Sequence, residues 1–72
     1  MTRTANTSKS AETLPYRIEL WHADRPETVE RVLARAVTVQ LARAIFHAAM
    51  EEHPQRRITL RKGGRIVSDS SS

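Results

Sequence analysis

Residues 27–53, ETVERVLARAVTVQLARAIFHAAMEEH, decide which fold the sequence predicts. The apolar residues of this stretch recur at intervals of three and four, which is the spacing of an amphipathic helix. Asp24 followed by Glu27 is typical of a helix N-terminus, and Pro26 fits a first helical turn. Pro54 ends the pattern. We therefore predict one helix over residues 27–53, about 40 Å long at 1.5 Å per residue.

The β-branched run Val37-Thr38-Val39 is the weak point of this helix, because β-branched residues have poor helix propensity. The sequence leaves open whether the helix is continuous there.

The segment before the helix, residues 16–21 (YRIELW), alternates apolar and charged residues up to the final Trp21. A period of two is typical of a half-buried strand. The strand has one apolar face and one largely charged face. The first face holds Tyr16, Ile18 and Leu20, and the second holds Arg17, Glu19 and Trp21.

Two short β-branched runs flank Gly63-Gly64 and predict a hairpin near the end of the chain. Two registers compete. A two-residue turn would pair Leu60 with Val67, whereas a three-residue loop with Gly64 in the left-handed conformation would pair Leu60 with Ile66. We favour the second register, because it keeps the basic residues off the apolar face formed by Ile58, Leu60 and Ile66.

Together these elements predict an α+β fold with the order β-α-β-β, one long helix packed on a small three-stranded sheet. The order of the strands is not determined. The chain of 72 residues is short enough for one domain, which we place at residues 14–69. The polar segments 1–13 and 70–72 have little to bury and are expected to be disordered tails.

The predicted helix is apolar on two sides, although a single sheet covers only one. We assign the side of Leu33, Val37, Leu41, Ala44 and Ala48, with Val29 and Ile45 more laterally, to the sheet. A second stripe holds Val32, Val39, Phe46 and Met50, and we expect it to be buried in a homodimer. The alternative is that this stripe packs within the chain, against the Leu14 segment or at a bend in the helix.

The charge of the chain is concentrated in the hairpin. The whole sequence has 12 Lys and Arg residues, 8 Asp and Glu residues and a formal net charge of +4. Residues 55–67 contain five of the basic residues and no acid, so the remainder carries seven basic and eight acidic residues.

Basic side chains beside Trp21 suit contacts with nucleic acid. The candidate contacts are Arg17, Trp21, Arg57, Arg61, Lys62 and Arg65. The competing interpretation, which we favour, is a solvated face that protects the sheet edges.

No set of residues in the sequence supports catalysis or a cofactor. Cysteine is absent, which excludes disulfides and thiolate ligands. His47 and Glu51 are four residues apart on the predicted helix, and an exposed pair explains them better than a metal site does. We expect neither an enzyme nor a metal site.

No apolar run approaches the ~18 residues of a membrane span, and no export signal is recognisable, so we expect no membrane partner and a cytoplasmic location.

The sequence thus predicts a small basic interaction module that self-associates through its helix. The alternative is a nucleic-acid-binding module that uses the arginine-rich hairpin.

Overall fold

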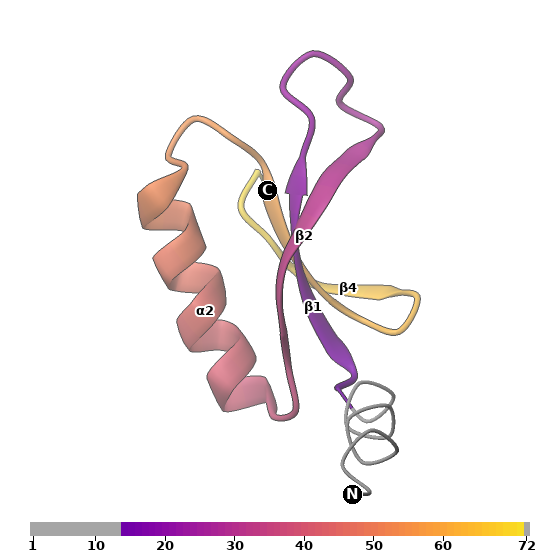
Figure 1. Ribbon diagram of the computed structural model, residues 1–72, viewed down its shortest axis with the longest axis vertical. Coiled ribbons are helices and arrows are strands. Elements are labelled where there is room, and N and C mark those ends of the chain that lie inside the picture. The colour runs from indigo at the N-terminus through magenta and orange to yellow at the C-terminus, as the bar shows by residue number, and fades with distance from the viewer. Residues whose placement is uncertain (1–13, 72) are drawn as a thin grey trace, which may run out of the picture.

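Strand β1, Tyr16–Trp21, lies inside the sheet and pairs with a neighbour on each side. The computed structural model describes residues 14–71, so the predicted tail 1–13 and Ser72 lie outside the described residues. β1 is followed by β2 (Val29–Ala36), helix α2 (Val39–Glu52), β3 (Ile58–Lys62) and β4 (Arg65–Asp69). The four strands form one sheet in the order β2-β1-β3-β4, and all neighbouring strands are antiparallel (Figure 1).

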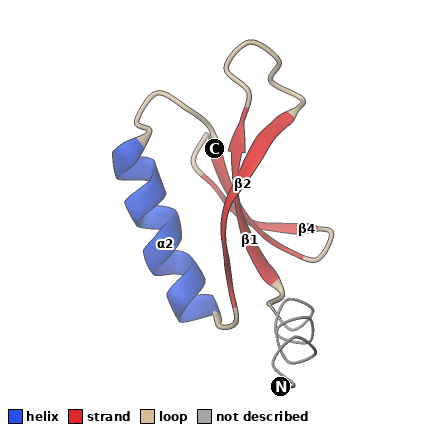
Figure 2. Cartoon of the chain, in the orientation of Figure 1, coloured by secondary structure: helices blue, strands red, loops and turns tan. Residues whose placement is uncertain are grey.

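The predicted α+β class is confirmed, and the finer description needs correction. The element order is β-β-α-β-β, the sheet has four strands, and the helix has 14 residues (Figure 2). The first part of the predicted helix is strand β2. The connection from β1 to β2 is closed by backbone hydrogen bonds, from His22 N–H to Thr28 O and from Thr28 N–H to Arg25 O, both 2.9 Å. Asp24 therefore does not cap a helix.

Helix α2 begins at the weak point that the sequence left open. Thr38 has an extended backbone, and its Oγ1 accepts a hydrogen bond of 3.2 Å from the Leu41 N–H. A threonine at this position satisfies one of the free N–H groups of the first turn. The β-branched run thus separates strand from helix, and the helix ends before Pro54 as predicted.

The core lies between one face of the sheet and one side of α2. Its buried side chains alternate along the two inner strands and recur at intervals of three and four on the helix. They are Ile18 and Leu20 of β1, Ile58 and Leu60 of β3, Ala36 of β2, and Ala42, Phe46 and Ala49 of α2. The sequence therefore predicted the faces of β1 and β3 correctly.

The assignment of the two sides of the helix was inverted. Phe46 is only 6 % exposed and belongs to the chain's own core, and Met50 packs against that core. Leu41, assigned to the sheet, is 53 % exposed, whereas Ile45, placed laterally on that side, does pack against the core. The error has a physical cause: Val32, Leu33 and Val37 were counted as helical, and they define the wrong side once the helix begins at Val39.

The last hairpin has the two-residue turn of the register that we did not favour, the favoured three-residue loop is wrong, and a bulge moves Leu60 away from Val67. Gly63-Gly64 forms a two-residue turn that pairs Lys62 with Arg65. Gly63, not Gly64, has the positive φ of +59°, which suits a turn with glycine at its first central position. A bulge then places Leu60 opposite Ser68. Ile66 consequently lies opposite Arg61 and is 39 % exposed, outside the core.

Pairing at the C-terminal end extends past β4. Ser70 N–H donates to Ile58 O at 2.9 Å, and Ile58 N–H donates to Ser70 Oγ at 2.8 Å. Ser71 bonds to the Asp69 carboxylate through its N–H and its hydroxyl. Ser70 and Ser71, which the sequence analysis placed in the C-terminal tail, are therefore tied to β3 and β4.

Candidate binding surfaces

The sheet face turned away from α2 is the first candidate surface, and we call it the open face. Its residues alternate with the core residues of β1 and β3. The strand registers arrange them in rows across the sheet. One row reads Arg35, Arg17, Arg61 and Ile66, the next Val32, Glu19, Thr59 and Asp69, and the last Val29 and Trp21 next to Arg57.

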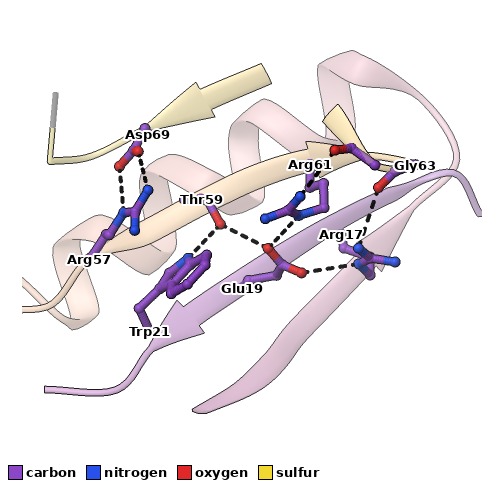
Figure 3. Close-up of polar contacts among 9 residues, drawn as sticks. Arg17, Glu19, Trp21, Arg57, Thr59, Arg61, Gly63 and Asp69 are labelled. Atoms are coloured by element: carbon purple, nitrogen blue, oxygen red, sulfur yellow. Dashed lines mark hydrogen bonds and ion pairs between the residues drawn. The ribbon is translucent and has the colours of Figure 1, made fainter. Parts of the chain in front are cut away.

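Glu19 is the centre of a hydrogen-bond network on this face (Figure 3). Its side chain is almost fully buried although it carries a charge. Oε1 accepts hydrogen bonds from Arg61 Nε at 2.9 Å and from Thr59 Oγ1 at 3.0 Å, and Oε2 accepts one from Arg17 Nε at 3.3 Å. The carboxylate therefore joins β1 to β3 and neutralises part of the charge of two arginines.

Burial alone would raise the pKa of Glu19, because water stabilises the charged carboxylate. The hydrogen bonds from Arg61 and Thr59, with the positive charges of Arg61 and Arg17, outweigh that effect, so the pKa lies below its ordinary value. Glu19 is thus held ionised, in a structural role.

Trp21, Arg57 and Asp69 form a second cluster on the open face (Figure 3). The indole N–H of Trp21 donates to Thr59 Oγ1 at 2.8 Å, and the Arg57 guanidinium lies 4.4 Å from the centroid of the indole ring. Arg57 also donates through Nε and Nη2 to the two Asp69 oxygens, at 3.1 and 2.6 Å. These hydrogen bonds hold the pKa of Asp69 well below its ordinary range. Arg57 is therefore fixed by two partners, and it occupies part of the Trp21 surface.

The six predicted nucleic-acid contacts are only partly brought together. Arg17, Trp21, Arg57 and Arg61 share the open face. Lys62 lies at the end of β3, with its amino group 5.6 Å from the Tyr16 ring, and Arg65 follows the turn. Arg35 joins the open face, and sequence reasoning missed it because residue 35 stood within the predicted helix. Counting Arg35 as an alternating residue of a strand would have found it.

The four residues predicted to form a self-association stripe do not lie on one exposed surface. Val32 is on β2 and is 38 % exposed, opposite Glu19. Phe46 is in the core, Met50 packs against it, and Val39 is the first, half-buried residue of α2. The predicted stripe is therefore not a surface that another chain can contact as a unit.

The outward side of α2 is the second candidate surface, and we call it the outer helix face. It consists of Leu41, Ala44 and Ala48 of α2 together with Val37, which precedes the helix, and all four are exposed. Val37 is 50 % and Leu41 53 % exposed, the two highest values among the exposed large apolar residues of the described chain. The helix is thus apolar on two sides, as the sequence indicates, with the two sides exchanged.

Two open pockets of about 400 Å³ each lie at the end of the sheet where β1 ends and β3 begins. Both are lined by Gln55, Arg56 and Arg57. Arg56 already donates to Trp21 O and to the Glu30 carboxylate, and its Nε, like Nδ1 of His22, is buried without a hydrogen-bond partner. Because these two atoms are closed off from solvent, a ligand in the pockets would not reach them.

Among residues 14–71, no three His, Asp or Glu side chains come together in a way that would hold a metal ion. Within the same residues, no helix is both long and apolar enough to cross a membrane.

Comparisons of the chain with family models, with curated proteins and with solved structures found no match.

Proposed function

We propose that this chain is a non-enzymatic interaction module that self-associates through the outer helix face. The supporting observation is the exposure of Leu41 on a helix whose other side is fully used by the core, and of Val37 just before that helix. Adjacent exposed apolar side chains of this size are unusual on a monomer and are typical of contact surfaces.

The spacing of the outer helix face suits a second helix. Leu41, Ala44 and Ala48 are separated by three and four positions, which places them in one line along α2, and Val37 lies just before the helix. Ala44 and Ala48 have small side chains, so the axes of two helices can approach to the short end of the usual ~8–10 Å range. The two ends of the line differ, with Leu41 at the end near the start of α2 and the alanines at the other. An antiparallel partner would place each Leu41 against an alanine of the other helix.

The charges of α2 favour a second copy in the antiparallel orientation. The helix has no acidic residue in its first turn and no basic residue in its last turn. Glu51 and Glu52 stand at its C-terminal end, where the helix dipole disfavours negative charge. An antiparallel second copy would bring these carboxylates beside the positive end of the other dipole. The same arrangement would remove an unfavourable interaction from both chains.

The expected association is weak. A helix of 14 residues is about 21 Å long at 1.5 Å per residue, so a single helix pair buries less than a standard protein interface. We therefore expect monomer and dimer to exchange in the micromolar range.

Analytical ultracentrifugation over a concentration series tests this proposal. The wild-type chain should shift from the monomer mass toward twice that mass as concentration rises. Leu41→Glu should stay monomeric with an unchanged melting temperature, because Leu41 contributes little to the core. Val67→Glu, which adds the same charge to an exposed residue of β4, is the matched control and should associate like the wild type. A wild-type chain that remains monomeric at millimolar concentration would refute the proposal, as would a Leu41→Glu variant that still dimerises.

A further inference from the structure

Three arginines lie side by side across the sheet, and this row is the feature of the open face that the fold explains least. Arg17 on β1 is directly opposite Arg35 on β2 and directly opposite Arg61 on β3. Neighbouring strands are about 4.8 Å apart, so the row extends over about 10 Å. Like charges directly opposite each other destabilise a sheet.

Edge protection does not account for the row. Charged side chains discourage the pairing of a free edge with another chain, and the free edges of this sheet are β2 and β4. Arg17 and Arg61 are on the inner strands β1 and β3, which are already paired on both sides. Only Arg35 lies on an edge strand.

Internal ion pairs account for the row only in part. Among residues 14–71, Glu19 is the one carboxylate that pairs with the row, and it serves both Arg17 and Arg61. Within residues 14–71, Arg35 makes no ion pair or side-chain hydrogen bond. The row therefore keeps an excess of positive charge. Arg17 and Arg61 also donate to the carbonyl oxygens of Gly63 and Gly64, at 3.4 and 3.2 Å, so the charge left without a partner in the described part of the chain is that of Arg35. A local departure from the pairing rules that the fold compensates only in part is characteristic of a binding site.

We infer that the row Arg35-Arg17-Arg61 binds the phosphates of a single-stranded nucleic acid laid across the open face. Guanidinium groups bind phosphate oxygens through paired N–H donors, which makes arginine suited to this contact. The neighbouring rows offer the half-buried or partly exposed apolar side chains of Val29, Val32 and Trp21, against which bases can pack. A lipid headgroup or polyglutamate would use the charges and leave these side chains without a role.

The shape of the surface favours a single strand over a duplex. Reading a duplex requires a helix or a two-stranded ribbon that enters the major groove. The only helix of the described residues packs on the opposite face of the sheet, against β1, β2 and β3. The bases must therefore come to the sheet, which a single strand allows.

Trp21 contributes less to the inferred binding of a single strand than its residue type suggests. The Arg57 guanidinium lies over the indole ring, and the indole N–H is already bonded to Thr59. Because Trp21 is the only tryptophan of the chain and lies on the open face, its fluorescence reports on a bound strand.

The test uses the whole chain and fluorescein-labelled, mixed-sequence oligonucleotides at low salt, followed by fluorescence anisotropy. Arg35→Gln is the diagnostic variant, because among residues 14–71 the Arg35 side chain makes no ion pair or hydrogen bond that the substitution would break. Arg43→Gln removes the same charge from the exposed side of α2 and is the matched control. We expect Arg35→Gln to weaken single-strand binding roughly five- to tenfold and to lower the salt slope by about 0.7. Arg43→Gln should leave that slope unchanged, and single strands should quench Trp21 fluorescence.

Several results would overturn the inference. Absence of binding by the wild type at low salt is one, and equal losses in Arg35→Gln and Arg43→Gln, which would indicate attraction by net charge alone, are another. Tighter binding of a duplex, of polyglutamate or of anionic vesicles would assign the row to a different partner. The monomeric variant Leu41→Glu should bind the single strand as the wild type does, so this inference and the proposed self-association can fail separately.

Discussion

Replacing Glu19 by glutamine keeps the size of the side chain and removes the charge at the centre of the polar network. In the folded chain both carboxylate oxygens accept hydrogen bonds, from Arg61 and Thr59 on one side and from Arg17 on the other. An amide has one accepting oxygen. Its NH₂ group would then face an arginine N–H, so two donors would meet at one end of the side chain.

The size of the effect follows from these contacts. A hydrogen bond to a charged group contributes about 1.5–3 kcal/mol, and the loss at Arg17 is discounted because a third of its side chain is exposed to water. We expect Glu19→Gln to lower the free energy of unfolding by about 2–3 kcal/mol, which lowers the melting temperature of so small a domain by roughly 10–20 °C.

Urea unfolding followed by circular dichroism measures this change, with Glu30→Gln as the control. Glu30 also pairs with an arginine, Arg56, but its carboxylate is solvent-exposed, so its loss should change the unfolding midpoint little. Equal losses in the two variants would contradict the role given to Glu19.

The same network makes stability depend on pH. The folded pKa of Glu19 lies below its ordinary value of about 4.5, so its stabilisation is fully present above that value and is lost as the pH falls through the folded pKa. The stability of Glu19→Gln should therefore fall less steeply than that of the wild type when the pH drops below about 4.5. Parallel losses of stability in the two proteins on acidification would refute this reasoning.

Three further substitutions test the fold. Phe46→Ala should destabilise the chain by about 3–5 kcal/mol and abolish the cooperative thermal transition, because Phe46 is a core residue, whereas an exposed stripe would predict little change. Thr38→Ala should cost about 1 kcal/mol in urea unfolding through loss of the helix cap, and Thr38→Asn should restore most of it. Gly63→Ala should destabilise the chain by about 1 kcal/mol, because its φ is positive, while Gly64→Ala should be nearly neutral; equal effects at the two glycines would contradict the turn described here.

The sequence predicted β1 and β3 well because their alternation is uninterrupted. Ile18 and Leu20 on β1, and Ile58 and Leu60 on β3, all face the helix as the period of two requires. Along these strands local pattern and tertiary packing agree, so the faces could be assigned without the structure.

Strand β2 was misread because two bulges change its phase. Extra residues at Leu33 and Glu30 interrupt the alternation. As a result Val29, Val32, Leu33 and Ala36 stand at positions i, i+3, i+4 and i+7, which is the spacing of a helix face. No local signal separates such a bulged strand from a helix, and only pairing with β1 decides between them.

The candidate surfaces could be predicted from the sequence where they follow from alternation, and not where they depend on strand pairing or on the start of the helix. Alternation predicted the charged side of β1 and β3. The hydrogen-bond network that neutralises much of this charge could not be predicted, because it depends on which carboxylate lies beside which arginine. The sequence analysis assigned the outer helix face to the sheet. The error arose because the side of α2 that packs on the sheet depends on where the helix begins.

The order β2-β1-β3-β4 also has a consequence for folding kinetics. The pairs β1–β2 and β3–β4 join segments that are close in sequence, so each can form locally and fast. The single seam between β1 and β3 joins residues about 40 positions apart, such as Glu19 and Thr59, and closing it carries the main loss of chain entropy. The transition state is therefore expected at the joining of two preformed hairpins, and a chain still emerging from the ribosome cannot complete its sheet until β3 is available.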